Sequence, residues 1–258
     1  MRYNSQGRKC SLGQRLGWFV GAVLGVVFLA PAAHATTFQF GANPSDPGFF
    51  GNVRTFTMNN LTVTATAWGY TRDVPPGQDN ALEKAALGQW YTGLGVCDQS
   101  EGQEWNCQIP AHQVDNLGPD NWVLFTFSEN VNPTNIVIDP YGVWDRDVSY
   151  RVGNVTLPLD LTGKSYIPEG DLAALGFTDW VEQASTPSDQ AINIALNVNR
   201  PVNALLFGAK SNNAPDQTVD GFKITSLSAI AVPEPKVLSL LGAGLLLLVS
   251  GVALRGRI

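Results

Sequence analysis

The sequence predicts an all-β fold, an antiparallel β-sandwich, flanked by an N-terminal signal peptide and one C-terminal transmembrane helix. Three observations predict this fold class. Short stretches that alternate apolar and polar residues recur between turn-forming residues throughout 36–231, no long helical pattern interrupts them, and the two ends of the chain carry apolar runs of a different kind. The 258 residues therefore divide into a signal peptide (1–35), a sandwich domain (36–231) and a C-terminal tail (232–258).

The clearest local pattern in the domain is a hairpin. Residues 54–58 and 61–68 alternate on either side of Asn59-Asn60, and asparagine accepts the left-handed backbone that a tight hairpin turn requires. Successive side chains of a strand point to opposite faces. The second strand is therefore expected to bury an apolar face made of Leu61, Val63, Ala65 and Ala67.

The rest of the domain predicts further short strands. Residues 79–90 break the alternation and predict a short helix or a loop that crosses a sheet edge. A second short helix is expected from Pro168 through Leu175, followed by a turn or a strand at 177–184. The remaining strands are expected at 89–96, 121–128, 134–139, 148–152, 191–197, 204–209 and 221–231. Roughly nine or ten short strands with almost no helix are typical of a sandwich.

The N-terminus has the three parts of a secretory signal peptide. Arg2, Arg8, Lys9 and Arg15 form a basic region without an acid, and residues 16–30 are apolar with glycine counted as neutral. Ala33 and Ala35 supply the small-x-small pattern of a cleavage site. We expect export through the Sec machinery and cleavage by signal peptidase after Ala35.

The C-terminus predicts a membrane span with a rigid preface. Residues 237–254 are apolar apart from two serines, and a helix of this length, at about 1.5 Å per residue, just crosses a bilayer core of about 30 Å. Arg255 and Arg257 follow the run, and Val232-Pro233-Glu234-Pro235 precedes it. The prolines break regular structure and hold an extended segment clear of the membrane.

This tail resembles the PEP-CTERM sorting domain. The family's Pro-Glu-Pro matches Pro233, Glu234 and Pro235, preceded here by Val232, its membrane segment matches 237–254, and its basic stop matches Arg255 and Arg257. The resemblance implies a Gram-negative bacterium and recognition by an exosortase. It also implies a membrane-anchored intermediate in the inner membrane, then a place at the cell surface or in the extracellular matrix. The alternative is a plain tail anchor on a proline-rich stalk.

Charge and cysteine use agree with export. The two terminal segments hold seven of the 16 Lys and Arg residues but only one of the 22 acids, so the middle of the chain is strongly acidic. An acidic domain lacks the basic footprint of a nucleic-acid partner. Cys97 and Cys107 remain after cleavage of the signal and are expected to form a disulfide in an oxidising compartment.

The middle of the chain also resembles a β-sandwich domain common in PEP-CTERM proteins. The matching stretches, in family order, are 93–96, 112–116, 125–128 and 145–147. This resemblance implies a jelly-roll-like sandwich.

Two turns within these stretches predict a metal site. Asp115, Asn116, Asp145 and Asp147 offer the loop oxygens that Ca²⁺ prefers, and the turns flank neighbouring predicted strands. The alternative is that Asp and Asn only form turns by bonding their own backbone.

A glycan-binding surface is the second candidate site. Trp105 and Trp144 are predicted to lie in loops or turns, where an aromatic ring can stack on a sugar, whereas Trp68, Trp90 and Trp122 are expected in the core. The alternative is that Trp105 and Trp144 only anchor their loops or pack in the core and bind no sugar.

An enzyme is the third reading of the chain. Glu101 and Glu104 could act as a carboxylate pair in glycoside hydrolysis, but both lie in a loop expected to be solvated. The sequence therefore predicts a non-enzymatic, structural or adhesive protein of an exopolysaccharide-rich envelope, with a carbohydrate-binding module, stabilised by calcium, as the alternative.

Overall fold

A computed structural model of the chain describes residues 34–41, 46–71, 81–102, 112–140, 142–165, 170–210, 218–232 and 242. Within this part of the chain the structure is antiparallel and all-β, with one short helix, α1 (Gly170–Ala174). The strands are β1 (Ala35–Gln39), β2 (Val53–Met58), β3 (Leu61–Thr71), β4 (Ala81–Lys84), β5 (Ala86–Trp90), β6 (Gly93–Cys97), β7 (Val114–Asp115), β8 (Asp120–Asp139), β9 (Val148–Gly153), β10 (Phe177–Gln183), β11 (Ile192–Ala195), β12 (Val202–Ala209) and β13 (Gly221–Ala231). The predicted fold class is confirmed at this level.

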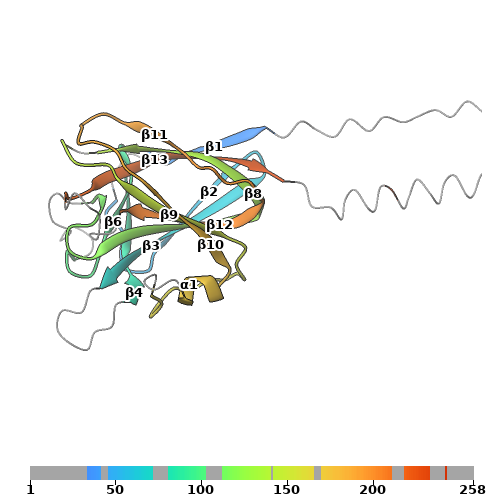
Figure 1. The fold of residues 1–258 in the computed structure, drawn as a ribbon, viewed down its shortest axis with the longest axis horizontal. Coiled ribbons are helices and arrows are strands. Elements are labelled where there is room, and N and C mark those ends of the chain that lie inside the picture. Colours follow the sequence, from blue (N-terminus) through green and yellow to red (C-terminus); the bar gives the residue numbers. More distant parts are fainter. Residues whose placement is uncertain are drawn as a thin grey trace, which may run out of the picture. The chain divides into compact units, whose positions relative to one another are not determined.

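The long strand β8 belongs to two layers. Residues 120–127 of β8 lie between β3 and β12, in a first layer that continues through β9 to β10. Residues 131–139 lie between β13 and β11, in a second layer in which β13 also pairs with β1 and β6. Figure 1 shows β1, β11 and β13 along one side of the domain and β3, β9, β10 and β12 below them. The arrangement is sandwich-like.

The main core lies between these layers. Phe40, which bonds to β13 through its backbone, stacks on Phe125 of β8 with ring centroids 5.6 Å apart. Phe207 of β12 meets Phe222 of β13 edge to face at 6.0 Å. Aromatic pairs of this geometry add to the stability gained by burying their area, so the two layers are joined by rings as well as by β8.

A second apolar cluster covers the outer face of the first layer. Trp122 and Leu206 point away from the main core and are buried under the segment that contains α1. The members of this cluster are Trp68, Tyr70, Leu82, Trp122, Leu124, Val155, Leu161, Leu172, Phe177, Ala204 and Leu206. Figure 1 shows α1 on this side of the strands.

The predicted hairpin is present, and its turn has the expected backbone. Asn59 and Asn60 have φ values of 51° and 67°, and β2 pairs with β3 from Val53 to Met58. The predicted apolar face of β3 is buried. The helix or loop expected at 79–90 is wrong where the structure describes it, because residues 81–84 form β4 and residues 86–90 form β5. Their alanines and Leu82 fit a pleated surface once neighbouring strands cover them.

The strands at 121–128 and 134–139 form one strand, β8, rather than two. The stretch 112–116, in which a turn was expected, contains the short strand β7. The ends of the described domain are β1 and β13, which pair with each other from Ala35 opposite Ile230.

The described residues include no helix long and apolar enough to cross a membrane. The predicted span 237–254 falls outside them except for Gly242, as does the signal peptide before His34.

The ring stack between the layers predicts a large effect of truncation. Phe125→Ala should lower the free energy of unfolding by about 3–5 kcal/mol, because it removes buried area and leaves a cavity. Phe49, 59% exposed, provides the matched control, and Phe49→Ala should change stability by less than about 0.5 kcal/mol. Urea unfolding followed by tryptophan fluorescence measures both, and similar losses in the two variants would contradict this description of the core.

Candidate functional site

Buried acids gather at the strand ends of the domain in two groups. The Asp220 cluster consists of Asp145, Asp147 and Asp220. The Asp115 cluster consists of Asp98, Glu101, Asp115 and Asn121. Among the described residues, the first group is the one whose three carboxylates lie close enough for one cation to bridge them as they stand. The second group contains buried oxygens without hydrogen-bond partners.

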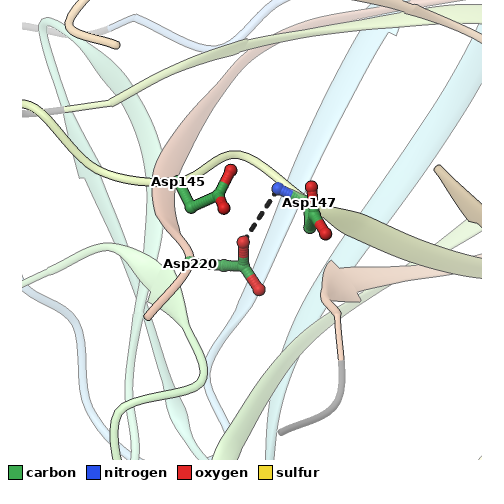
Figure 2. Close-up of side chains that lie close together, drawn as sticks. All are labelled: Asp145, Asp147 and Asp220. Atoms are coloured by element: carbon green, nitrogen blue, oxygen red, sulfur yellow. Dashed lines mark hydrogen bonds between the residues drawn. The ribbon is translucent and has the colours of Figure 1, made fainter. Parts of the chain in front are cut away.

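The Asp220 cluster joins the beginnings of two strands. Asp145 and Asp147 precede β9, and Asp220 precedes β13. Figure 2 shows the three side chains lying close together. One carboxylate oxygen from each residue lies within 4.8 Å of the others, and all three residues are buried. The spacing is one that a hard cation can bridge.

Backbone amides already occupy several of these oxygens. The Asp147 amide donates to Asp220 Oδ1 at 2.9 Å, drawn as the dashed line in Figure 2. The Arg146 amide donates to Asp145 Oδ1 at 2.8 Å, and the Ser185 amide donates to Asp147 Oδ1. Hydrogen bonds to the ionised carboxylate stabilise its charge.

Two side chains complete the Asp220 cluster. Lys210 Nζ lies 3.2 Å from Asp147 Oδ2, and both side chains are buried. Asn116 Nδ2 donates to Asp220 Oδ2 at 2.8 Å, and the Asp220 amide donates back to Asn116 Oδ1 at 2.8 Å. The cluster thus ties together the ends of β7 and β12 and the beginnings of β9 and β13. Its geometry permits a cation, but its oxygens are largely used by protein donors.

The Asp115 cluster forms where a glycine lets two segments approach. Asn121 of β8 pairs with Gly69 of β3, and a Cβ at Gly69 would lie 2.8 Å from the Cβ of Asp98. A larger residue at position 69 would therefore push Asp98 away from Asn121. In the native chain Asn121 Nδ2 donates to Asp115 Oδ1 at 3.3 Å and makes a longer contact of 3.5 Å with Asp98 Oδ2.

The loop after β6 presents the other carboxylate of this cluster. Asp98 Oδ1 accepts hydrogen bonds from the Ser100 amide at 2.7 Å and the Ser100 hydroxyl at 2.6 Å, which fold the loop into a turn. The turn brings Glu101 back, so that the Asp98 amide donates to Glu101 Oε2 at 3.3 Å. Glu101 is half-buried rather than solvated as expected.

Burial and mutual repulsion disfavour the charged forms of these acids. Burial, together with the charges of Asp115 and Asp98, raises the pKa of Glu101 to about 8. Burial and the charges of Asp98 and Asp120 raise the pKa of Asp115 to about 7, against hydrogen bonds from Leu117 and Asn121. Burial also raises the pKa of Asp98. Such shifts mark a group of carboxyls that lacks sufficient positive charge.

The four residues predicted as metal ligands are divided between these clusters. Asn116, Asp145 and Asp147 meet in one network, which Asp220 completes, whereas the Asp115 carboxyl belongs to the other cluster. The reason is the alternation of an extended chain, in which Asp115 and Asn116 point to opposite sides while Asp145 and Asp147 point to the same side. Whether a cation binds at any of these residues stays a prediction.

Sequence reasoning did not identify Asp220, Lys210, Asp98 or Asn121 as members of these clusters. Each lies at or next to a strand end, and acids at strand ends are a weak signal because turns favour the same residues. Their meeting depends on the order of strands in the sheet, which the sequence does not display.

The tryptophans expected in the core are buried there: Trp68, Trp90 and Trp122 are 3%, 8% and 0% exposed. Trp144 is half-buried and exchanges backbone hydrogen bonds with Ser188. Trp105 lies outside the described residues, so the predicted pair of sugar-stacking rings stays a prediction.

A pocket of about 330 Å³ lies over β3 and is lined by Val53, Trp68, Lys84 and Asp160, among others. Lys84 Nζ lies 3.4 Å from Asp160 Oδ2 at this pocket. Trp68 is 3% exposed, so its ring offers little surface on which a sugar could stack.

Several other predicted site residues fall outside the described part of the chain. They are Ala33, Cys107, Pro233, Glu234, Pro235, Arg255 and Arg257. Ala35 begins β1, Cys97 is fully buried at the end of β6, and Val232 follows β13. The signal cleavage, the pairing of Cys97 with Cys107 and the sorting motif therefore stay predictions.

Comparison of the chain with known protein families, with curated proteins and with solved structures found no match.

The buried ion pair between Lys210 and Asp147 predicts a strong loss of stability when the lysine ammonium group is removed. Lys210→Met should lower the free energy of unfolding by about 3–5 kcal/mol, because it leaves the buried Asp147 carboxylate without its counter-charge. The control is Lys84→Met, whose partner Asp160 is 60% exposed, and it should cost less than about 1 kcal/mol. Chemical denaturation measures both variants. An equal, small loss in each would show that the Asp220 cluster does not hold the strand ends together.

Proposed function

We propose that this chain is an exported, non-enzymatic protein of a Gram-negative bacterium, delivered to the cell surface or extracellular matrix by an exosortase. In this proposal the β-domain, a jelly-roll-like sandwich, is the part of the chain that is delivered. The signal peptide directs export through the Sec machinery, and the tail from Val232 to Arg257 holds the chain in the inner membrane until it is sorted. The role of the β-domain is structural or adhesive within an exopolysaccharide-rich envelope.

The pairing of β1 with β13 is the observation that carries the proposal. Thr36 lies opposite Ala229, and Phe38 lies opposite Leu227, so the first and last strands of the domain are hydrogen-bonded neighbours. The predicted cleavage after Ala35 would leave this pairing nearly complete. The signal peptide and the C-terminal tail can therefore each be removed without breaking the pairing between β1 and β13.

The last backbone hydrogen bond before the proline-rich segment supports the same boundary. The Val232 amide donates to the Asn130 carbonyl at 2.9 Å, and Pro233, which follows, has no amide hydrogen to donate. The described part of the domain thus remains hydrogen-bonded up to the residue before the Pro-Glu-Pro motif. A processing enzyme needs an extended substrate at that point, and two prolines in three residues provide one.

The contacts of the Asp220 cluster favour a structural role over catalysis for its three acids. The carboxylates of the Asp220 cluster are held by amides, Asn116 and Lys210, which fixes them in place and lowers their availability for proton transfer. The net negative charge of the domain helps to keep it soluble before assembly, which is compatible with a matrix protein.

A carbohydrate-binding module is the second candidate, and the pocket beside Trp68 is the observation that favours it. Its volume of about 330 Å³ is at the small end of the range for ligand pockets, roughly 300–1,000 Å³. Lys84 and Asp160 at its rim offer a donor and an acceptor for sugar hydroxyls. The pocket would take one or two sugar units of a polymer.

Sorting through the tail predicts a change in mass that depends on exosortase. In cells with the enzyme, the mature chain should begin at Thr36 and lack the segment 237–258, whereas cells without it should retain that segment. Replacing Pro233, Glu234 and Pro235 by alanine should give the retained form in both cells. Intact mass spectrometry of the purified protein measures the ends directly.

The control for this experiment is Pro215→Ala, which leaves the motif untouched and should be processed as the native chain is. A native chain that keeps residues 237–258 in both cell types would contradict sorting and leave a plain tail anchor.

The carbohydrate alternative predicts retardation of the native chain in a gel that contains the host's exopolysaccharide. The double variant Lys84→Ala and Asp160→Ala should migrate freely, because it loses both polar groups at the rim of the pocket. Equal migration of the native chain with and without polysaccharide would remove this alternative, and would not affect the sorting proposal.

A further inference from the structure

The Asp115 cluster differs from the Asp220 cluster in what its oxygens contact. Asp115 Oδ2 and Asn121 Oδ1 are buried and have no hydrogen-bond partner among the described residues. Asp115 is 1% exposed and Asn121 is 0% exposed. A buried acceptor without a partner costs about 1–3 kcal/mol, so two in one cluster indicate that a partner of another kind belongs there.

The remaining two members also keep an oxygen available. Asp98 Oδ2 has only the 3.5 Å contact with Asn121 Nδ2, since the short hydrogen bonds from Ser100 go to Oδ1. The hydrogen bond that the described residues supply to Glu101 goes to Oε2, which leaves Oε1. Each of the four side chains therefore offers one oxygen.

Positive charge is missing from this cluster in the described part of the chain. Among those residues, no Lys, Arg or His forms an ion pair with Asp98, Glu101 or Asp115. In the Asp220 cluster, by contrast, Asp147 forms an ion pair with Lys210. Buried carboxylates are stable when they are paired or when they bind a metal, and Lys210 provides such a pair for Asp147 in the Asp220 cluster.

The Asn121 amide shows where a cation would lie. Its Nδ2 group, which carries partial positive charge, is placed between the carboxylates of Asp98 and Asp115. The nitrogen and oxygen ends of an amide have nearly the same shape. If the Asn121 amide group rotated by about 180°, Oδ1 would take the place of Nδ2 between the carboxylates of Asp98 and Asp115. The amide oxygen would repel the two carboxylates there unless a cation lay among the three groups.

We propose that Asp98, Glu101, Asp115 and Asn121 bind one divalent cation of the hard, oxygen-seeking class, and that Ca²⁺ fits best. Three carboxylates and one amide carbonyl are typical Ca²⁺ ligands, and water completes the usual six to eight oxygens. Ca²⁺ tolerates irregular coordination, whereas Mg²⁺ requires a near-ideal octahedron. The half-buried Glu101 forms the solvent side of the site and provides the route of entry.

Binding would also fix the loop that follows β6. Asp98 and Glu101 belong to this loop, whereas Asp115 and Asn121 belong to β7 and β8. A cation among them connects the loop to two strands through bonds that the protein alone does not supply. The site is independent of the sorting proposal, because it uses only residues within the β-domain.

Titration of the metal-free full chain with CaCl₂ tests the site. After treatment with EDTA, calorimetry at pH 7.5 should detect one Ca²⁺ per chain with Kd in the range of about 10⁻⁵–10⁻³ M. Saturating Ca²⁺ should raise Tm by about 4 °C or more, and MgCl₂ at the same concentration should have a smaller effect. No binding heat and no change in Tm would overturn the proposal.

Three isosteric variants locate the site. Glu101→Gln and Asp115→Asn should each bind Ca²⁺ at least about tenfold more weakly while keeping the native far-ultraviolet circular dichroism. Asp145→Asn, the matched control in the Asp220 cluster, should bind as the native chain does. If Asp115→Asn does not fold, Glu101→Gln decides the result, because its side chain is only half-buried. Loss of binding in Asp145→Asn alone would assign the cation to the Asp220 cluster and overturn the proposal.

Discussion

The passage of β8 from one layer to the other is the constraint on which the rest of the domain depends. Its first half pairs with β3 and β12, and its second half pairs with β11 and β13. Any change of register in β8 would therefore shift both layers and would move alternate side chains from the core to the surface. The strand also places Asn121 at its beginning, next to Gly69, so the position of the Asp115 cluster follows from the same pairing.

Two clusters of acids illustrate two ways to keep carboxylates inside a protein. In the Asp220 cluster, amides, Asn116 and Lys210 surround the charges, and the result is a junction between strand ends. In the Asp115 cluster, backbone amides, Ser100 and Asn121 donate to the acids, but no ion pair with a described residue balances their charge. Burial raises the pKa of both Glu101 and Asp115. We therefore give more weight to buried oxygens without partners than to close spacing of carboxylates when we propose a cation site in this domain.

Local patterns predicted the fold well where the residues themselves determine the structure. The Asn59-Asn60 turn, the apolar face of β3 and the full extent of β13 are examples. The prediction failed at 81–90, where alanines and leucine favour a helix in isolation and the neighbouring strands override that preference. It also failed to separate Asp115 from Asn116, although strand alternation would have done so. Asp220 and Lys210 could not be assigned, because their contacts join segments that are distant in the sequence.

The central claim is that the buried acids of this domain need a cation at the Asp115 cluster and not at the Asp220 cluster. Anomalous diffraction from crystals of the full chain grown with CaCl₂ locates bound calcium directly. A single strong peak among Asp98, Glu101, Asp115 and Asn121, with the Asn121 amide turned so that Oδ1 faces the peak, is the predicted result. A peak among Asp145, Asp147 and Asp220, or no peak at either cluster, would contradict it.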